Sequence, residues 1–484
     1  MGDGTDHHAD NEKTAGFTET SSDDIARYSQ GHRELRVLRA SGSDNVKLAK
    51  DGATVLIPQP SDDPEDVLNW STAKKYKVLL SLVFASLLTD FGMTWGTVSN
   101  RTQPTVGMIG LHLVQVLFEA QAPSFHKSIP TTADSVSGGL FLQGPGGIIA
   151  VPLVQRFGRL PVLFWSQFLS ALMVMAAALS PTYASFTAFR ALQGFVNTAP
   201  QVVGFSVVND MFFFHERVRY INIWVFCLLG GPFLGPFIAA WLIQAIDWRA
   251  DFGVLAGLYG FSALLVVFLG DETLYDRRNP QARSKGFASH IMTLLGITGF
   301  QAKGRPGMWT VFKDILVLQI RPQILFLTVI YVSVLVAWVI GVNTTFSQIV
   351  LPPPYSFGPS ALAGSWAAPL IGALMGELWG NWFNSWLQAR YIRRHDGLYE
   401  LENRLWGAYA PTLVGFTGLI LYGQAQQHAL HWIALLVAWA CIAFAMVAAT
   451  TAVSAYCLDS FPGHAALVAS IVNMWRQVPR WCIL

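Results

Sequence analysis

The chain has 484 residues, of which 52% are hydrophobic and only 13% are charged, and its net charge is +2. Ordinary soluble domains carry about 25% charged residues, and the long apolar runs of this chain could not all be buried in a soluble core. The composition therefore excludes a soluble globular protein and gives no reason to expect nucleic acid as a partner. It predicts a polytopic, all-α membrane protein whose solvent is the lipid bilayer.

The N-terminal segment differs in composition from the rest of the chain. It is rich in Asp, Ser, Thr, Gly and His, and it lacks the apolar stretch of a signal peptide. Such a segment cannot bury enough apolar surface to fold by itself. We therefore expect a disordered tail over residues 1–70, located in the cytosol.

Apolar segments long enough to cross a bilayer follow one another from residue 76 onward. A spanning helix needs roughly 20 apolar residues. This length predicts six spans in the first part of the chain, near 76–97, 137–154, 160–179, 184–208, 221–243 and 252–270. Four more are predicted near 323–349, 361–383, 406–424 and 431–453, and an eleventh begins near Ala465.

The order of these spans predicts two halves. We expect an N-terminal six-helix half over 71–270, a cytosolic central loop over 271–320 and a C-terminal half over 321–484. In folds made of two such halves, the substrate site lies between them near the bilayer midplane. The C-terminal half is expected to be incomplete, with the last one to two helices truncated, because the chain ends within the eleventh span.

Basic residues lie in alternate connections between the spans. They precede the first span and follow the second, fourth and eighth, at Lys74, Lys75, Lys77, Arg156, Arg159, Arg217, Arg219, Arg390, Arg393 and Arg394. The intervening connections SPTYAS and GQAQQHALH contain neither Lys nor Arg. Positively charged loops stay in the cytosol, so the pattern places the N-terminus there. The expected location is the plasma membrane.

The connection between the second and third spans reads VPLVQRFGRLPV. Gly158 suits a tight turn, and Arg156 and Arg159 can bind helix C-termini and acidic side chains of neighbouring helices. The segment resembles the Gly-x-Leu-x-Asp-Arg-x-Gly-Arg loop signature of the major facilitator superfamily, which implies conformational gating by these three residues. Val151 and Gln155 replace the Gly and Asp of the pattern, and positive-inside topology is the alternative explanation of the arginines.

The fourth span contains the sequence FRALQGF. An arginine inside an apolar helix costs about 2.5–3.5 kcal/mol on insertion scales, so Arg190 should face the protein interior and be paired. Arg190, Gln193 and Gly194 resemble the Arg-x-x-Gln-Gly motif of the same family, in which the arginine is associated with proton coupling. A structural ion pair is the alternative.

The fifth span contains the sequence LGGPFLGPFIAAWL. Glycines four residues apart allow helices to approach closely, and proline distorts a helix. Gly231, Gly235 and Pro236 resemble the Gly-x-x-x-Gly-Pro-x-x-Gly-Gly motif of proton-coupled drug exporters, which implies a role in the rocking of the halves. Ala239 and Ala240 replace the last two glycines.

Five further segments resemble fungal members of the drug:proton antiporter branch of this family. They are PQPSDDPEDVLNWSTAKK (58–75), NDMFFFHER (209–217), DET (271–273), YIRRHDGLYELENRLW (391–406) and YCLDSFPGHAALVASIVNMWR (456–476). The resemblance implies a major facilitator fold of two six-helix halves and export of secondary metabolites or toxic organic compounds. Other fungal members of this type import nutrients.

Two carboxylates lie inside predicted spans. Asp90 is in the first span and Glu377 is in the eighth. A membrane carboxylate must be paired or must face a polar cavity, so each is a candidate for proton coupling or substrate binding. The alternative for Asp90 is a structural hydrogen bond, and the alternative for Glu377 is a position near a helix end.

Two segments interrupt the family resemblance. The first is 98–115, whose first codons and last codon can be written as the ends of an intron, and whose eighteen codons keep the reading frame. We interpret it as a retained intron, with a genuine extracellular insertion as the alternative; in that case Asn100 would be a glycosylation acceptor. The second is QVPRWCIL at the C-terminus, which places Pro479 and Arg480 where apolar residues belong.

These observations together predict a transporter. The leading reading is exchange of protons for a small, mostly apolar organic molecule, with Asp90 and Arg190 in coupling. The runner-up is uptake of a nutrient or chelate by proton symport; a receptor or scaffold and an inactive truncated remnant are further alternatives. No nucleophile–base pair, metal cluster or phosphate loop indicates an enzyme. We expect no cofactor, no metal and a monomer.

Overall fold

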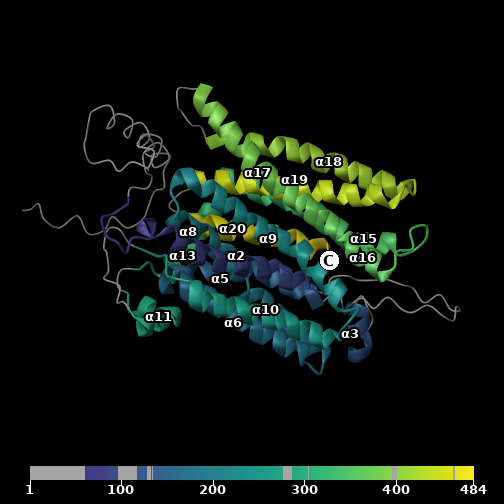
Figure 1. The fold of residues 1–484 in the computed structure, drawn as a ribbon, viewed down its shortest axis with the longest axis horizontal. Coiled ribbons are helices and arrows are strands. Elements are labelled where there is room, and N and C mark those ends of the chain that lie inside the picture. The colour runs from purple at the N-terminus through teal and green to yellow at the C-terminus, as the bar shows by residue number, and fades with distance from the viewer. Residues whose placement is uncertain are drawn as a thin grey trace, which may run out of the picture. The chain divides into compact units, whose positions relative to one another are not determined.

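The computed structural model describes residues 60–95, 117–127, 132, 135–275, 286–302, 305–394, 401–461 and 464–483. The predicted tail up to residue 59, the predicted intron 98–115 and the predicted glycosylation acceptor Asn100 lie outside these residues. The described segments fold as a bundle of long helices (Figure 1).

Among the described residues, the first half begins with the short helix η1 and continues with eight α-helices. Their bounds are η1 Val67–Asn69, α2 Thr72–Thr94, α3 Leu117–Phe125, α5 Ser135–Phe157, α6 Arg159–Ala178, α7 Tyr183–Val196, α8 Ala199–Met211, α9 Phe214–Leu242 and α10 Trp248–Leu269. The second half contains α14 Pro322–Ile324, η2 Leu325–Val332, α15 Ser333–Val350, α16 Pro359–Ser365, α17 Ala367–Arg394, η3 Leu401–Leu405, α18 Trp406–Gln427, α19 Trp432–Ser460 and α20 Ala465–Ile483.

The predicted spans all correspond to helices. In the described part of the chain, nine helical stretches are long and apolar enough to cross a membrane, and they match spans one to three and five to ten. The fourth span is divided into α7 and α8, with the break at Asn197 and Thr198. Pro200, in the first turn of α8, has no N–H to continue the α7 ladder. The eleventh span continues as α20 through Pro479.

The helices contact one another within and between the halves. Figure 1 shows α17, α18 and α19 packed together, and α6 beside α10. The halves meet along two lines: α9 packs against α17 and α19, and α20 packs against α5 and α8. Any side chain on α8, α9 or α20 that faces these contacts is therefore placed between the two halves.

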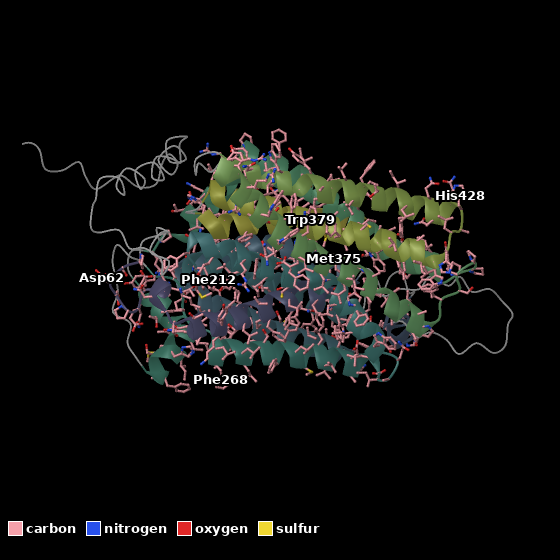
Figure 2. The ribbon with its side chains drawn as sticks, turned by 45° about the horizontal axis from the view of Figure 1, so that its top comes forward. Asp62, Phe212, Phe268, Met375, Trp379 and His428 are labelled. Atoms are coloured by element: carbon pink, nitrogen blue, oxygen red, sulfur yellow. The ribbon has the colours of Figure 1, made fainter. Side chains whose placement is uncertain are left out.

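The outer surface of the bundle is apolar. Phe268 on α10 is 75% exposed and Met375 on α17 is 55% exposed, and Figure 2 labels both. A protein in water rarely exposes so many large apolar side chains, whereas lipid tails are a matching solvent for them. Polar side chains are instead concentrated between the helices, where Asp90, Arg190 and Gln201 are 0–1% exposed.

One predicted boundary needs correction. Residues 60–70, assigned to the disordered tail, include η1, which Asp66 caps by accepting a hydrogen bond from the backbone N of Leu68. The segment is also tied to α2, because Lys75 Nζ donates to the Leu68 carbonyl at 2.9 Å. Local hydrogen bonds, which composition does not reveal, fold these residues.

The described part of the predicted central loop contains three helices. These are α11 Phe287–Leu294, α12 Ile297–Gln301 and α13 Met308–Gln319. In α13, Val311, Ile315 and Leu318 recur at helical spacing and are buried, and the helix packs against α5 and α20. A search for segments of spanning length overlooks such short amphipathic helices.

Candidate functional site

Polar side chains on one face of α7 and α8 point toward the last turns of α2. Arg190, Gln193, Asn197 and Gln201 follow at spacings of three, four and four residues, which places them on one helical face. All four are at most 1% exposed. This row connects the fourth predicted span to the backbone and side chains of the first.

Arg190 binds the C-terminal end of α2. One guanidinium nitrogen donates to the Gly92 carbonyl and the other to the Met93 carbonyl, both at 2.9 Å. The last carbonyls of a helix lack intrahelical partners and carry partial negative charge, so they offset the charge of Arg190. Its third partner is the Gln193 amide oxygen at 2.9 Å. Arg190 is therefore interior and paired, as its position in an apolar helix requires, but its partners are carbonyls and not an acid.

A second group of hydrogen bonds holds the same part of α2. Tyr259 on α10 donates its hydroxyl proton to the Leu88 carbonyl at 2.7 Å. Asn197 donates to the Tyr259 hydroxyl at 2.7 Å and to the Thr89 carbonyl at 2.9 Å. These contacts all lie within the first half, so they fix α2 against α7 and α10 within that half.

Asp90 pairs with a residue of the other half. One carboxylate oxygen accepts a hydrogen bond from Gln201 Nε2 at 3.0 Å. The other lies 3.0 Å from a guanidinium nitrogen of Arg476 on α20. The same nitrogen of Arg476 donates to Asn473 Oδ1 at 3.2 Å. The side chains of Asp90 and Arg476 are 0% and 3% exposed, so a buried ion pair connects α2 to α20.

Arg476 was not predicted as a site residue. It ends the segment SIVNMWR, which was read only for its family resemblance. The rule that singled out Asp90 and Arg190, that an ionisable residue within a span must be paired and functional, applies equally to Arg476.

The connection between α5 and α6 binds acidic residues at the end of the bundle that carries Lys74, Arg159 and Arg217, here named the basic end. Gly158 has a φ of +111°, which favours glycine. The Glu272 carboxylate accepts hydrogen bonds from the backbone N–H groups of Arg159 and Leu160 at 3.0 and 3.1 Å. It thereby caps the N-terminus of α6.

Arg159 joins three segments that the sequence flagged separately. Its guanidinium forms an ion pair with Asp210 at the end of α8 and donates to the Thr273 hydroxyl at 3.1 Å. Arg156 instead contacts the predicted central loop (271–320). Arg156 donates to the Phe300 carbonyl at 3.4 Å, and its own carbonyl accepts from Arg305 at 2.8 Å. The contacts with acids and helix ends are those expected for this loop, and the gating role stays a prediction.

The glycines of α9 allow its backbone to touch α2. A Cβ atom on Gly231 would lie 2.7 Å from the Leu87 carbonyl oxygen, and one on Gly235 would lie 2.5 Å from the Phe91 carbonyl oxygen. Pro236 follows within α9. Leu87 and Phe91 flank Asp90 along α2. This close packing therefore fixes the rotation of α2 about its own axis, and with it the direction of the carboxylate.

Two further carboxylates lie within helices and apart from Asp90: Glu377 is half-buried and Asp251 is buried. Glu377 on α17 faces α9 near Cys227, and neither of its oxygens has a hydrogen-bond partner among the described residues. Asp251 in the first turn of α10 is 0% exposed and accepts a hydrogen bond from Trp95 Nε1 at 2.8 Å. The sequence analysis predicted Glu377 as a candidate but not Asp251.

An apolar cavity of about 310 Å³ lies within the first half. Helices α5, α6, α7 and α8 line it, and Leu295 and Gly296 of the predicted central loop border it. Trp165, Phe195 and Leu153 are among its walls. Neither Asp90 nor Arg476 is among the residues that line it, so this cavity is separate from the ion pair.

Long apolar helices, an apolar outer surface and a buried charged cluster between two halves define the class of a multi-pass helical membrane transporter. The chain belongs to the Major Facilitator Superfamily, whose sequence profile matches residues 80–480. The predicted family and fold are thereby confirmed, and the protein is a membrane transporter of this family.

Curated relatives are fungal transporters. The chain is 26% identical to MFS-type transporter penM of Penicillium rubens over 421 residues, covering 86% of this chain and 78% of the relative. It is 24% identical to efflux pump radE of Floropilus chiversii over 426 residues, covering 86% and 74%.

Solved structures share the fold at low identity. The proton:xylose symporter XylE bound to 6-bromo-6-deoxy-D-glucose matches with a TM-score of 0.54 at 13% identity, covering 86% of this chain and 88% of that one. The human organic anion transporter MFSD10 matches with a TM-score of 0.52 at 15% identity, covering 84% and 91%.

Proposed function

We propose that the protein exports a small organic compound across the plasma membrane in exchange for protons, with its N-terminus in the cytosol. The relative radE, which is named an efflux pump, supports the direction. The observation that carries the coupling is the buried ion pair between Asp90 and Arg476, because it joins the two halves through a group that can take up a proton.

Protonation of Asp90 would weaken the contact between the halves. The ionised carboxylate offsets the charge of Arg476 at 3.0 Å. Once the carboxylate is neutral, Arg476 carries a buried charge without its counter-ion, which is strongly unfavourable in a low-dielectric interior. The two halves then separate more readily where α2 meets α20. The bound proton thereby changes the balance between the inward-facing and outward-facing states.

Arg190 has a different part in this proposal. Its guanidinium is bound to carbonyls of α2 within the same half, so it positions the helix that carries Asp90. The cluster of Arg159, Asp210 and Glu272 closes the cytosolic end when the transporter faces outward, and it must open for substrate to enter from the cytosol.

Deletion of the gene tests the direction. Cell and medium extracts of a deletion strain, compared by mass spectrometry with those of the parent, should show at least one organic compound retained in the cells. Reintroduced wild type and Asp251→Asn should restore secretion, while Asp90→Asn should not. A compound depleted from the deletion strain would indicate uptake, and unchanged profiles would reject transport of a metabolite.

A further inference from the structure

Five buried amide side chains surround the ion pair between the halves. Three come from the first half and two from α20: Gln143, Asn197, Gln201, Asn473 and Gln477, here named the amide cluster. Their side chains belong to residues that are 0–4% exposed. None of them is needed to close a helix end, except that Asn197 is the C-cap of α7.

The members of the amide cluster are linked through two neighbouring residues of α2 and one of α20. Gln143 and Asn197 both donate to the Thr89 carbonyl, at 3.5 and 2.9 Å. Gln201 donates to the next residue, Asp90. On the other side Arg476 donates to Asn473, and Gln477 donates to the same Asn473 oxygen at 3.5 Å. The five amides therefore belong to one polar region that spans the contact between the halves.

Every member of the amide cluster has a polar atom without a hydrogen-bond partner among the described residues. The atoms are the oxygens of Gln143, Asn197, Gln201 and Gln477 and the Nδ2 nitrogen of Asn473. An unpaired amide atom in a membrane interior is unfavourable, so a ligand or water must satisfy it. Four of the five atoms are acceptors, which are complemented by hydroxyl or N–H groups.

The charges around the amide cluster cancel. Asp90 and Arg476 offset each other at 3.0 Å, and the carbonyls of α2 offset Arg190. An organic ion of either sign would be attracted by one member of the pair and repelled by the other, so the pair gives no net preference for a cation or an anion. An uncharged molecule meets neither repulsion.

We propose that the amide cluster and Asp90 recognise an uncharged organic molecule that carries hydroxyl or N–H groups. The inference rests on the proposed export function and specifies its substrate class. The donors of the molecule bind the four amide oxygens and the ionised Asp90 carboxylate when the halves move apart. Its apolar remainder packs against the surrounding helices.

This assignment also explains exchange in place of cotransport. An ionised carboxylate only accepts hydrogen bonds, whereas a protonated one loses part of that capacity. A donor-bearing substrate and a proton therefore compete for Asp90. Among the described residues, the charged and titratable groups that contact this part of α2 include Arg476 from α20, Arg190 from α7 and the Tyr259 hydroxyl from α10.

Four probes with one naphthalene skeleton test the substrate class. Cells that express the full chain, or an empty vector, are loaded with 2-naphthol, 2-methoxynaphthalene, 2-naphthoate or 2-naphthylmethylammonium, and the retained amount is measured. Expression should lower retention of 2-naphthol alone. Equal efflux of 2-methoxynaphthalene, or efflux of either ion, would overturn the proposal.

Variants connect this selectivity to the amide cluster. Gln143→Leu and Gln201→Leu should each reduce the rate of 2-naphthol efflux about tenfold, the effect of one lost buried hydrogen bond. The matched control is Gln167→Leu on α6, which is also 0% exposed and lies outside the cluster. Equal effects of all three would assign the cluster to packing or bound water. A metabolite exported in the gene-deletion experiment, with no efflux of 2-naphthol, would overturn the substrate class while leaving export intact.

Discussion

The ion pair between Asp90 and Arg476 offers a quantitative test of coupling. Both side chains are at most 3% exposed and their charged atoms lie 3.0 Å apart. Removing one member of such a pair leaves a buried charge and costs about 3–5 kcal/mol, whereas removing both members is often close to neutral. Asp90→Asn and Arg476→Gln should therefore each destabilise the protein strongly, and the double variant should recover most of the loss.

The assay combines stability with transport. Thermal unfolding of the purified protein in detergent, arranged as a double-mutant cycle, should give an interaction free energy of about 3 kcal/mol. Reconstituted into vesicles, the double variant should exchange substrate more slowly than the wild type, because Asp90 also binds it, and should lose the acceleration that a proton gradient gives the wild type. Asp251→Asn, which alters a buried carboxylate outside the pair, should leave that acceleration intact.

Three results would refute the reasoning. If the destabilisation of the double variant equals the sum of the destabilisations of the two single variants, the pair carries no interaction free energy. If Arg476→Gln also retains the response of the wild type to a proton gradient, Arg476 is not part of coupling. A double variant that is stable and fully driven by protons would show that the pair is structural and that another group takes the proton.

Three further predictions follow from local geometry. Gly158→Ala should lower the thermal stability by about 1–3 kcal/mol, because alanine is strained at a φ of +111°; unchanged unfolding would contradict this account of the turn. Gly235→Leu should abolish expression of folded protein, measured by size-exclusion chromatography, because a Cβ there would lie 2.5 Å from a carbonyl oxygen. Gly257→Leu, where a Cβ meets nothing within 4 Å, is its control. Arg190→Lys should lose about 1.5–3 kcal/mol of stability, because lysine cannot reproduce the two-pronged contact with α2, while the dependence of transport on pH should persist; loss of that dependence would return Arg190 to a coupling role.

The sequence allowed prediction of the spans and of the family, because apolar length and local motifs carry that information. It also placed Asp90, Arg190 and the glycines of α9 in the interior. It did not predict their partners: Asp90 contacts Arg476, and Arg190 contacts carbonyls of α2. Partners of interior charges depend on which helices adjoin, and helices far apart in sequence leave no local pattern.

The amide cluster is a second example of contacts that the local sequence does not reveal. Gln143, Asn197 and Asn473 are ordinary polar residues in their own segments, and none occupies a motif position that the sequence analysis singled out. Only the packing of α20 against α5 and α8 brings them together. Helix α13 was not predicted for a different reason: it is shorter than the run of apolar residues by which spanning helices were identified.

The short helix α8 has a mechanical consequence. It carries Gln201, which holds Asp90, and nine residues later Asp210, which holds Arg159 at the basic end. At 1.5 Å per residue these two contacts are roughly 13 Å apart on one rigid rod. Because the chain breaks between α7 and α8 at Asn197 and Thr198, α8 can tilt as a lever while α7 stays anchored to α2. A small shift at the Asp90 carboxylate would then also displace the contact between Asp210 and Arg159 at the basic end.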